Sequence, residues 1–174
     1  MTTLLAFTVL VLLVALERVA ELVVSTRNAA WSKERGGVES GLGHYPLMVV
    51  LHTGLLAGAL VEAWARRPDV PAALAWSMLA LVLASQALRW WCIATLGRQW
   101  NTRVIVVPGL TPVTGGPYRL LRHPNYVAVV VEGLALPLVH AAWLTAVVFT
   151  IANAALLTVR IRCEDRALTG LARA

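Results

Sequence analysis

The chain has 174 residues, of which 59% are hydrophobic and only 14% are charged. A small soluble domain lacks the interior to bury so many apolar side chains, so this composition predicts an integral membrane protein. The net charge of +6 comes almost entirely from arginines that lie between apolar segments. This arrangement favours an anionic membrane face or a small anionic ligand over nucleic acid as the partner.

Three long apolar segments come first in the chain, at about residues 4–24, 44–64 and 72–96. Each reaches the roughly 20 residues that a helix needs to cross a bilayer. The first has neither a basic leading region nor a small-residue cleavage site, so we expect a retained span rather than a signal peptide.

Two shorter apolar segments follow, at about residues 126–139 and 143–159, separated only by HAAW and Pro137. We expect them to form a tight hairpin packed within the bundle. The segments are continuous and rich in Leu and Ala, without the alternation of strands, and helices satisfy their own backbone groups in lipid. The sequence therefore predicts one all-α domain over residues 1–174, with about five transmembrane helices.

The basic residues are divided unevenly between the two ends of this five-helix bundle. One side carries eleven and the other carries two. The positive-inside rule therefore places the larger group in the cytoplasm and the N-terminus outside. The eleven are Arg27, Lys33, Arg35, Arg98, Arg103, Arg119, Arg122, Arg160, Arg162, Arg166 and Arg173, and the two are Arg66 and Arg67.

Residues 115–127 read GGPYRLLRHPNYV and form the most polar and rigid segment near the middle of the chain. The Gly-Gly-Pro triplet predicts a turn, and Pro124 is favoured as the first residue of a helix. The free backbone N–H groups of that helix, beside Arg122 and His123, suit an anion. The alternative is an interfacial helix start, whose arginines contact lipid phosphates and whose tyrosines belong to the aromatic belt. The segment alone does not separate the two.

The C-terminal segment RIRCEDRAL, residues 160–168, carries a second polar pattern. Arg160 and Glu164 are four residues apart and therefore share one helix face. They can act together in a site, or they can form a simple salt bridge on a solvated helix end.

Acidic residues also occur inside the apolar spans, where charges are rare and usually paired or functional. Glu17 and Glu21 share a face of the first span, and Glu132 lies in the fourth. The two in the first span are expected either to pair with Arg89 or another basic residue across the bundle, or to line a substrate tunnel.

The two motifs together resemble a known family. GGPYRLLRHPNYV is similar to the G-x-Y…R-H-P-x-Y signature of the isoprenylcysteine carboxyl methyltransferase (ICMT) family, and RIRCEDRAL resembles that family's R-I-x-x-E-E-x-x-L signature. The resemblance is strongest over about residues 96–168. The segments ERVAELVVSTRNAAW and GGVESGLGHYPLMVVLH are similar to a bacterial branch of the family associated with type III polyketide synthases.

The resemblance implies a methyltransferase that uses S-adenosylmethionine, in a bacterial inner membrane with its active site on the cytoplasmic side. It implies a cofactor pocket formed by the loop before the fourth helix and the end of the last helix. The acceptor would be an oxygen of a lipophilic molecule, as a carboxylate, enol or phenol: a long-chain polyketide or an isoprenylcysteine-like acid. Arg160 becomes the catalytic residue that faces the acceptor. The residues assigned to the cofactor are Leu110, Thr111, Pro112, Val113, Tyr118, His123, Pro124, Asn125, Tyr126 and Glu164.

The sequence departs from the family pattern at two positions. Leu110 stands where the family commonly has His, and Asp165 stands where it has a second Glu. Cys92 and Cys163 have neither ligand-like nor disulfide-like spacing, so no metal is expected.

Three other functions compete with this interpretation. An NADPH-dependent membrane reductase of the sterol-reductase type shares R-H-P-x-Y, but needs additional basic residues and usually a longer chain. A phospholipid N-methyltransferase differs only in its acceptor atom. A non-enzymatic membrane anchor does not need Pro, Gly, Arg and His concentrated on one side.

Overall fold

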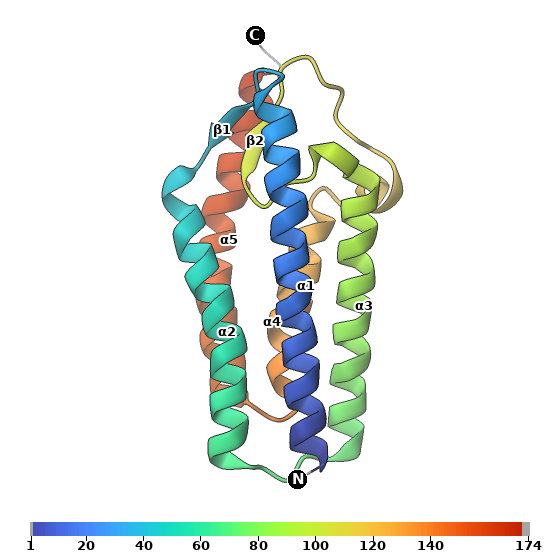
Figure 1. Ribbon diagram of the computed structural model, residues 1–174, viewed down its shortest axis with the longest axis vertical. Coiled ribbons are helices and arrows are strands. Elements are labelled where there is room, and N and C mark those ends of the chain that lie inside the picture. The colour runs from blue at the N-terminus through green and yellow to red at the C-terminus, as the bar shows by residue number, and fades with distance from the viewer. Residues whose placement is uncertain (1, 172–174) are drawn as a thin grey trace.

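The computed structural model describes residues 2–171, so Arg173 lies outside the described residues. Five helices run roughly along one direction and form a bundle (Figure 1). Helix α1 begins at one end of the bundle, and α5 finishes at the opposite end. The helices are α1 (Thr2–Lys33), α2 (Tyr45–Arg66), α3 (Ala72–Leu96), α4 (Pro124–Leu138) and α5 (Trp143–Leu171).

Proline and left-handed residues set the helix limits. Helix α2 has proline in its first turn and ends at Arg66, and the following Arg67 adopts φ 44°. Helix α3 follows Pro71 and ends at Gly97, which adopts φ 53°. Helix α4 begins at Pro124, as the preference of proline for a first helical position predicts. The predicted spans at 44–64 and 72–96 are therefore confirmed almost to the residue.

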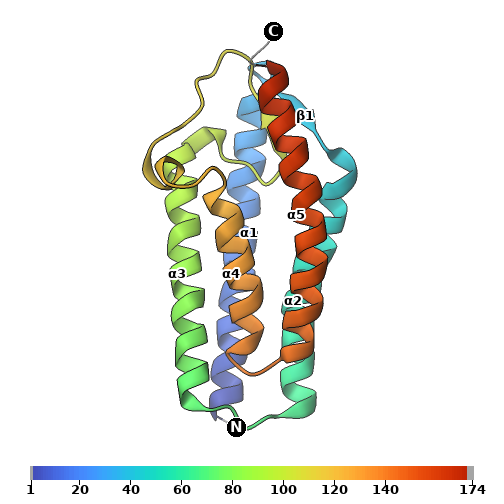
Figure 2. The same ribbon diagram turned by 180° about the vertical axis from the view of Figure 1, so that it is seen from behind.

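Four of the described helices are long and apolar enough to cross a membrane. Helix α4 has 15 residues, about 22 Å of helix, which is less than the roughly 30 Å of a hydrocarbon core. It packs between α3 and α5, where most of its side chains are buried (Figure 2). The chain is thus an all-α integral membrane protein whose shortest helix is mostly buried and exposes one apolar stripe at Val127, Val130 and Leu134.

Helix α5 is longer than its apolar segment. It has 29 residues and continues to Leu171, whereas the apolar segment alone suggested an end near residue 159. The segment RIRCEDRAL contains good helix formers, so the helix continues past its apolar part. The placement of Arg160 and Glu164 on one helix face is therefore confirmed.

The apolar core lies toward the end of the bundle where α1 begins. Phe7 and Val11 of α1 pack there with Ala59, Val82 and Leu136. Large apolar side chains elsewhere, such as Leu12 and Ile151, point outward and are exposed, as lipid-facing residues are.

A buried network of charges joins α1, α3 and α4. Arg18 contacts Glu21 at 2.6 Å and Glu132 at 2.9 Å. Arg89 contacts Glu21 at 3.5 Å and also donates to Glu132. Two guanidinium groups thus face two carboxylates. Structural pairing is therefore confirmed for Glu21, whereas Glu17 instead accepts a hydrogen bond from the Trp90 indole.

A two-stranded antiparallel sheet covers the end of the bundle near the C-terminus of α5. Strand β1 (Val38–Ser40) pairs with β2 (Val104–Val106), with Glu39 opposite Ile105. Neither strand was predicted, because three residues within a polar connection give no periodicity to read. The sheet ties the α1–α2 connection to the α3–α4 connection.

Candidate functional site

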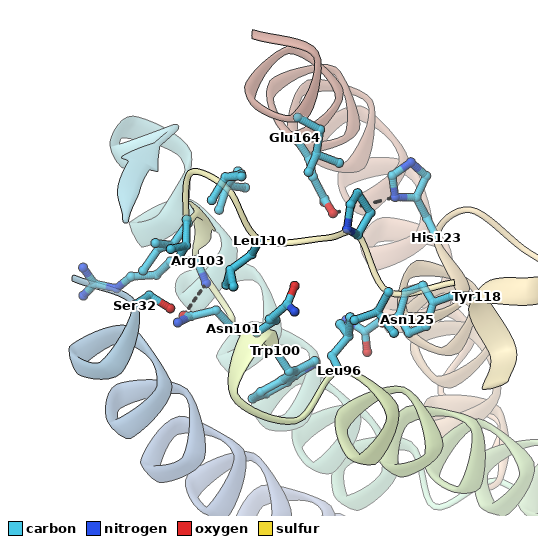
Figure 3. Close-up of a pocket in the computed structure, with 18 of the residues that line it drawn as sticks. Ser32, Leu96, Trp100, Asn101, Arg103, Leu110, Tyr118, His123, Asn125 and Glu164 are labelled. Carbon is cyan, nitrogen blue, oxygen red and sulfur yellow. Dashed lines mark hydrogen bonds and ion pairs between the residues drawn. The ribbon is translucent and has the colours of Figure 1, made fainter. Parts of the chain in front are cut away.

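A cavity of about 390 Å³ lies beside this sheet, at the end of the bundle that carries both motifs. Strand β2 and the following loop form one wall, the 118–126 segment forms another, and α5 from Arg160 to Leu168 forms the third. Figure 3 shows Glu164 and His123 on one side, Arg103 and Asn101 on the other, and Leu110 between them.

The structure brings most of the predicted site residues together around this cavity. Two do not line it: Pro124 is fully buried at the start of α4, and Thr111 is exposed. Residues that the sequence analysis assigned to the site and that line the cavity are Leu110, Pro112, Val113, Tyr118, His123, Asn125, Tyr126, Arg160 and Glu164.

Tyr126 connects the two motifs. Its hydroxyl donates a hydrogen bond to the Glu164 carboxylate and accepts one from Arg160 Nε at 3.0 Å. Arg160 and Glu164 share a helix face, but they form no direct ion pair in the part of the chain that the structure describes. The alternative of a simple i,i+4 salt bridge is therefore wrong, because the tyrosine hydroxyl lies between the two groups.

His123 lies beside Tyr126 and the two acidic residues of α5, Glu164 and Asp165. Its ring stacks on Tyr126, with the ring centroids 5.3 Å apart. Its Nδ1 is 3.9 Å from a Glu164 oxygen, and its Nε2 is 3.3 Å from Asp165. Two carboxylates and an imidazole thus lie at one edge of the cavity and offer both donors and acceptors.

Tyr118 supplies a hydroxyl at the cavity wall. Burial, together with the neighbouring Cys92, raises the pKa of this hydroxyl well above its usual range. The group therefore remains protonated and can donate a hydrogen bond.

The β-sheet wall is held by a charged clasp at Glu39. Arg103 contacts the Glu39 carboxylate at 3.0 Å, and Lys33 contacts the same carboxylate at 3.3 Å. The Arg103 guanidinium also lies 4.8 Å from the centre of the Tyr45 ring. Burial acts to raise the pKa of Glu39, but the hydrogen bonds from Arg103 and Lys33 outweigh it and keep that pKa below its usual range. Sequence reasoning missed this clasp, since it depends on the unpredicted sheet.

Helix α1 positions the segment that precedes β2. Asn28 donates to the Trp100 carbonyl at 2.7 Å, and the Thr102 backbone N–H donates to Ser25 Oγ at 3.0 Å. The sequence analysis also missed these contacts. A signal was present, because four buried polar residues recur on one face at helical spacing: Glu21, Ser25, Asn28 and Ser32.

A second cavity, of about 160 Å³, adjoins the first and extends into the bundle between α1, α2, α4 and α5. The residues that line both cavities are Trp100, Asn101, Asn125, Tyr126 and Arg160.

Arg160 lies in the wall that the two cavities share and is only 6% exposed. Its Nη2 donates to the Thr102 carbonyl at 2.6 Å, and its Nη1 contacts the Met48 sulfur at 3.3 Å. No carboxylate of residues 2–171 forms an ion pair with this guanidinium. A buried cation without an anionic partner is costly, so the shared wall favours an anionic ligand.

Comparison with known proteins identifies the family. The sequence model of the isoprenylcysteine carboxyl methyltransferase (ICMT) family matches residues 78–170, which include most of α3, all of α4, both motifs and nearly all of α5. The chain is also 37% identical over 162 residues to the uncharacterized protein YpbQ of Bacillus subtilis (strain 168), covering 93% of this chain and 96% of that protein. The chain therefore belongs to the ICMT family, and with its apolar helices it is a membrane methyltransferase.

Proposed function

We propose that the protein transfers a methyl group from S-adenosylmethionine to an anionic oxygen of a lipophilic acceptor. The observation that carries this proposal is the position of Arg160, a buried cation in the wall between a larger cavity and a smaller one. The larger cavity would take the cofactor and the smaller one the acceptor.

The larger cavity suits a cofactor of this kind. Its volume of about 390 Å³ falls within the range of small-molecule sites, and members of the family use S-adenosylmethionine. Glu164 can accept hydrogen bonds from amino or ribose hydroxyl groups. Asn125 Oδ1 and Trp100 Nε1 are buried at this wall and have no hydrogen-bond partner among the described residues, so each can bond to a ligand.

The groups around Arg160 favour an oxygen anion as the acceptor. The bonds from Tyr126 and Thr102 hold the guanidinium in place, and neither partner neutralises its charge. A carboxylate matches the planar fork of arginine, and an enolate or phenolate is stabilised by the same charge.

The chemistry is a substitution at carbon. When bound, the cofactor would supply an electrophilic methyl group from its sulfonium and would leave as the neutral thioether S-adenosylhomocysteine. The protein aligns the acceptor oxygen with that methyl group and excludes water. A carboxylate acceptor becomes a neutral ester and needs no base. An enol must first lose its proton to water, and Arg160 then stabilises the anion.

The acceptor enters from the bilayer between α1 and α2. Leu22 of α1 and Val49 of α2 both line the smaller cavity, and each is 42% exposed on the lipid-facing side of the bundle. The excess of basic residues at this end supports an opening in the cytoplasmic leaflet. Long-chain polyketides and isoprenylcysteine-like acids both meet these requirements.

Arg160 also separates this function from its rivals. A phospholipid N-methyltransferase must bind an amine that is cationic in water, and a buried guanidinium repels such a group. Membership of the ICMT family favours methyl transfer over NADPH-dependent reduction.

The test is methyl transfer in membranes that contain the protein. Membranes are incubated with S-adenosylmethionine labelled in its methyl group, and the lipid fraction is then counted before and after mild alkali. We expect label in lipid with the wild type and not with Arg160→Ala. Release by alkali identifies a carboxyl ester, whereas retained label on a phospholipid amine would refute the oxygen acceptor.

A further inference from the structure

The smaller cavity contains a polar subsite that the methyl-transfer reaction does not use. We propose that this subsite, formed by Asn153 and His52, binds an uncharged polar group, such as a hydroxyl, part-way along the acceptor's chain. The inference rests on the proposed function, because it places the anionic end of the acceptor at Arg160.

Asn153 is the main element of the subsite. It is only 2% exposed and lines the smaller cavity from α5. Its Oδ1 atom is buried and has no hydrogen-bond partner within residues 2–171. An amide left unpaired in an apolar bundle is unfavourable, so a ligand group that bonds to it is stabilised.

His52 supplies a second neutral group. Its Nδ1 lies 2.8 Å from the Met48 carbonyl, which can only accept, so this nitrogen carries the proton and Nε2 of the neutral ring is an acceptor. The ring packs edge-on against Phe149, one turn from Asn153 on the same face of α5. A ligand hydroxyl can donate its single proton to the unpaired Asn153 Oδ1, and His52 Nε2 offers a second acceptor in the same subsite.

The charges near the subsite explain why its ligand is uncharged. Arg18, Glu21 and Arg89 also line this cavity, and together with Glu132 they form the network of two cations and two anions. Their charges balance, so a further charge at this depth has no counter-ion. The cavity is thus cationic at Arg160 and polar but neutral at Asn153.

The spacing along α5 sets the position of the second polar group. Asn153 and Arg160 are seven residues apart, so they share one face and are separated by about 10 Å along the axis. Leu156 and Leu157 line the cavity between them. The ligand therefore has an anionic head, an apolar stretch of several carbons and then an uncharged polar group.

The test measures binding of three acids to the purified full chain with S-adenosylhomocysteine present. The acids are hexadecanoic, 2-hydroxyhexadecanoic and 10-hydroxyhexadecanoic acid. We expect the 10-hydroxy acid to bind about tenfold more tightly than the other two, as hydrogen bonds of ordinary strength to a buried amide and imidazole predict. Asn153→Leu should bring the affinities of the three acids within about twofold of one another, because a hydrogen bond of ordinary strength would produce a larger difference. Thr158→Val, an exposed position on the same helix, should keep the preference.

The outcomes separate this inference from the proposed function. Equal binding of the three acids by the wild type, a preference that survives Asn153→Leu, or no binding of any acid would overturn the subsite. If Asn153→Leu is not recovered folded, His52→Leu tests the same subsite with the same expected loss. Failure of the wild type to bind S-adenosylhomocysteine would refute the proposed function itself.

Discussion

Tyr126 of α4 donates a hydrogen bond to Glu164 of α5, and this contact joins the two sequence motifs. The same hydroxyl accepts a hydrogen bond from Arg160 at 3.0 Å. One tyrosine thus links a carboxylate in the larger cavity to a guanidinium in the wall between the two cavities.

Glu164→Gln should weaken the binding of S-adenosylmethionine about tenfold, because a charge-assisted hydrogen bond is stronger than a neutral one. The Tyr126 hydroxyl can still donate to the amide oxygen, so we expect little change in stability. Calorimetry measures the affinity. Glu34→Gln, whose side chain is 73% exposed, is the control with unchanged affinity, and unchanged affinity in Glu164→Gln would remove this carboxylate from the site.

Tyr126→Phe should lower kcat by about tenfold or more, because Glu164 can then approach Arg160 and neutralise the charge that stabilises the acceptor anion. The loss of the buried hydroxyl should also lower the free energy of unfolding by about 1 kcal/mol. Single-turnover kinetics and thermal unfolding measure the two effects. A normal kcat would mean that the hydroxyl does not hold the two charges apart.

Arg160→Ala should reduce turnover about a hundredfold or more, because the lost guanidinium stabilises the negative charge of the acceptor oxygen. Cofactor affinity should be nearly unchanged, because this group is not assigned to the cofactor. Arg160→Lys keeps the charge without the planar fork, so it should recover only part of the activity. The measurement is kcat at saturating cofactor for all three proteins. Equal activity of the wild type and Arg160→Ala would contradict the role of this residue.

Glu39 makes the clasp at the β-sheet dependent on pH. Its folded pKa lies below the ordinary value of 4.5, so its contribution to stability is complete above pH 4.5 and is lost as pH falls through the folded pKa. Glu39→Gln should therefore lower the free energy of unfolding by about 1 kcal/mol at pH 7. Thermal unfolding below about pH 4 should show a smaller difference. A difference that is constant with pH would exclude this carboxylate as its source.

The buried charge network should resist removal of a single member. Arg89→Met leaves Glu132 and Glu21 with one guanidinium, and the free energy of unfolding should fall by roughly 3–5 kcal/mol. Adding Glu132→Gln restores the balance of charges, so the double variant should be less destabilised than the sum of the single variants. Detergent-unfolding curves for the four proteins form the cycle. Strict additivity would show that the two residues do not interact.

The sequence predicts the helices well and their connections poorly. Hydropathy located α2 and α3 because lipid requires long apolar helices, and Pro124 marked the start of α4. Strands β1 and β2 could not be read in this way. They form outside the membrane, where short polar segments carry weak periodicity.

The motifs predicted which residues gather at the site, but not how they are bonded. Spacing on one helix suggested that Arg160 contacts Glu164, whereas a tyrosine from α4 lies between them. The smaller cavity draws on α1 and α2, which lie outside the matched family region, and only tertiary packing brings Asn153 and His52 to it.

The proposed function requires that the larger cavity bind S-adenosylmethionine. Calorimetry of the detergent-purified protein with S-adenosylmethionine, S-adenosylhomocysteine and NADPH tests it most directly. We predict that the first two bind and that His123→Ala and Glu164→Gln weaken both. Binding of NADPH alone would contradict the proposed methyl transfer and would favour a reductase.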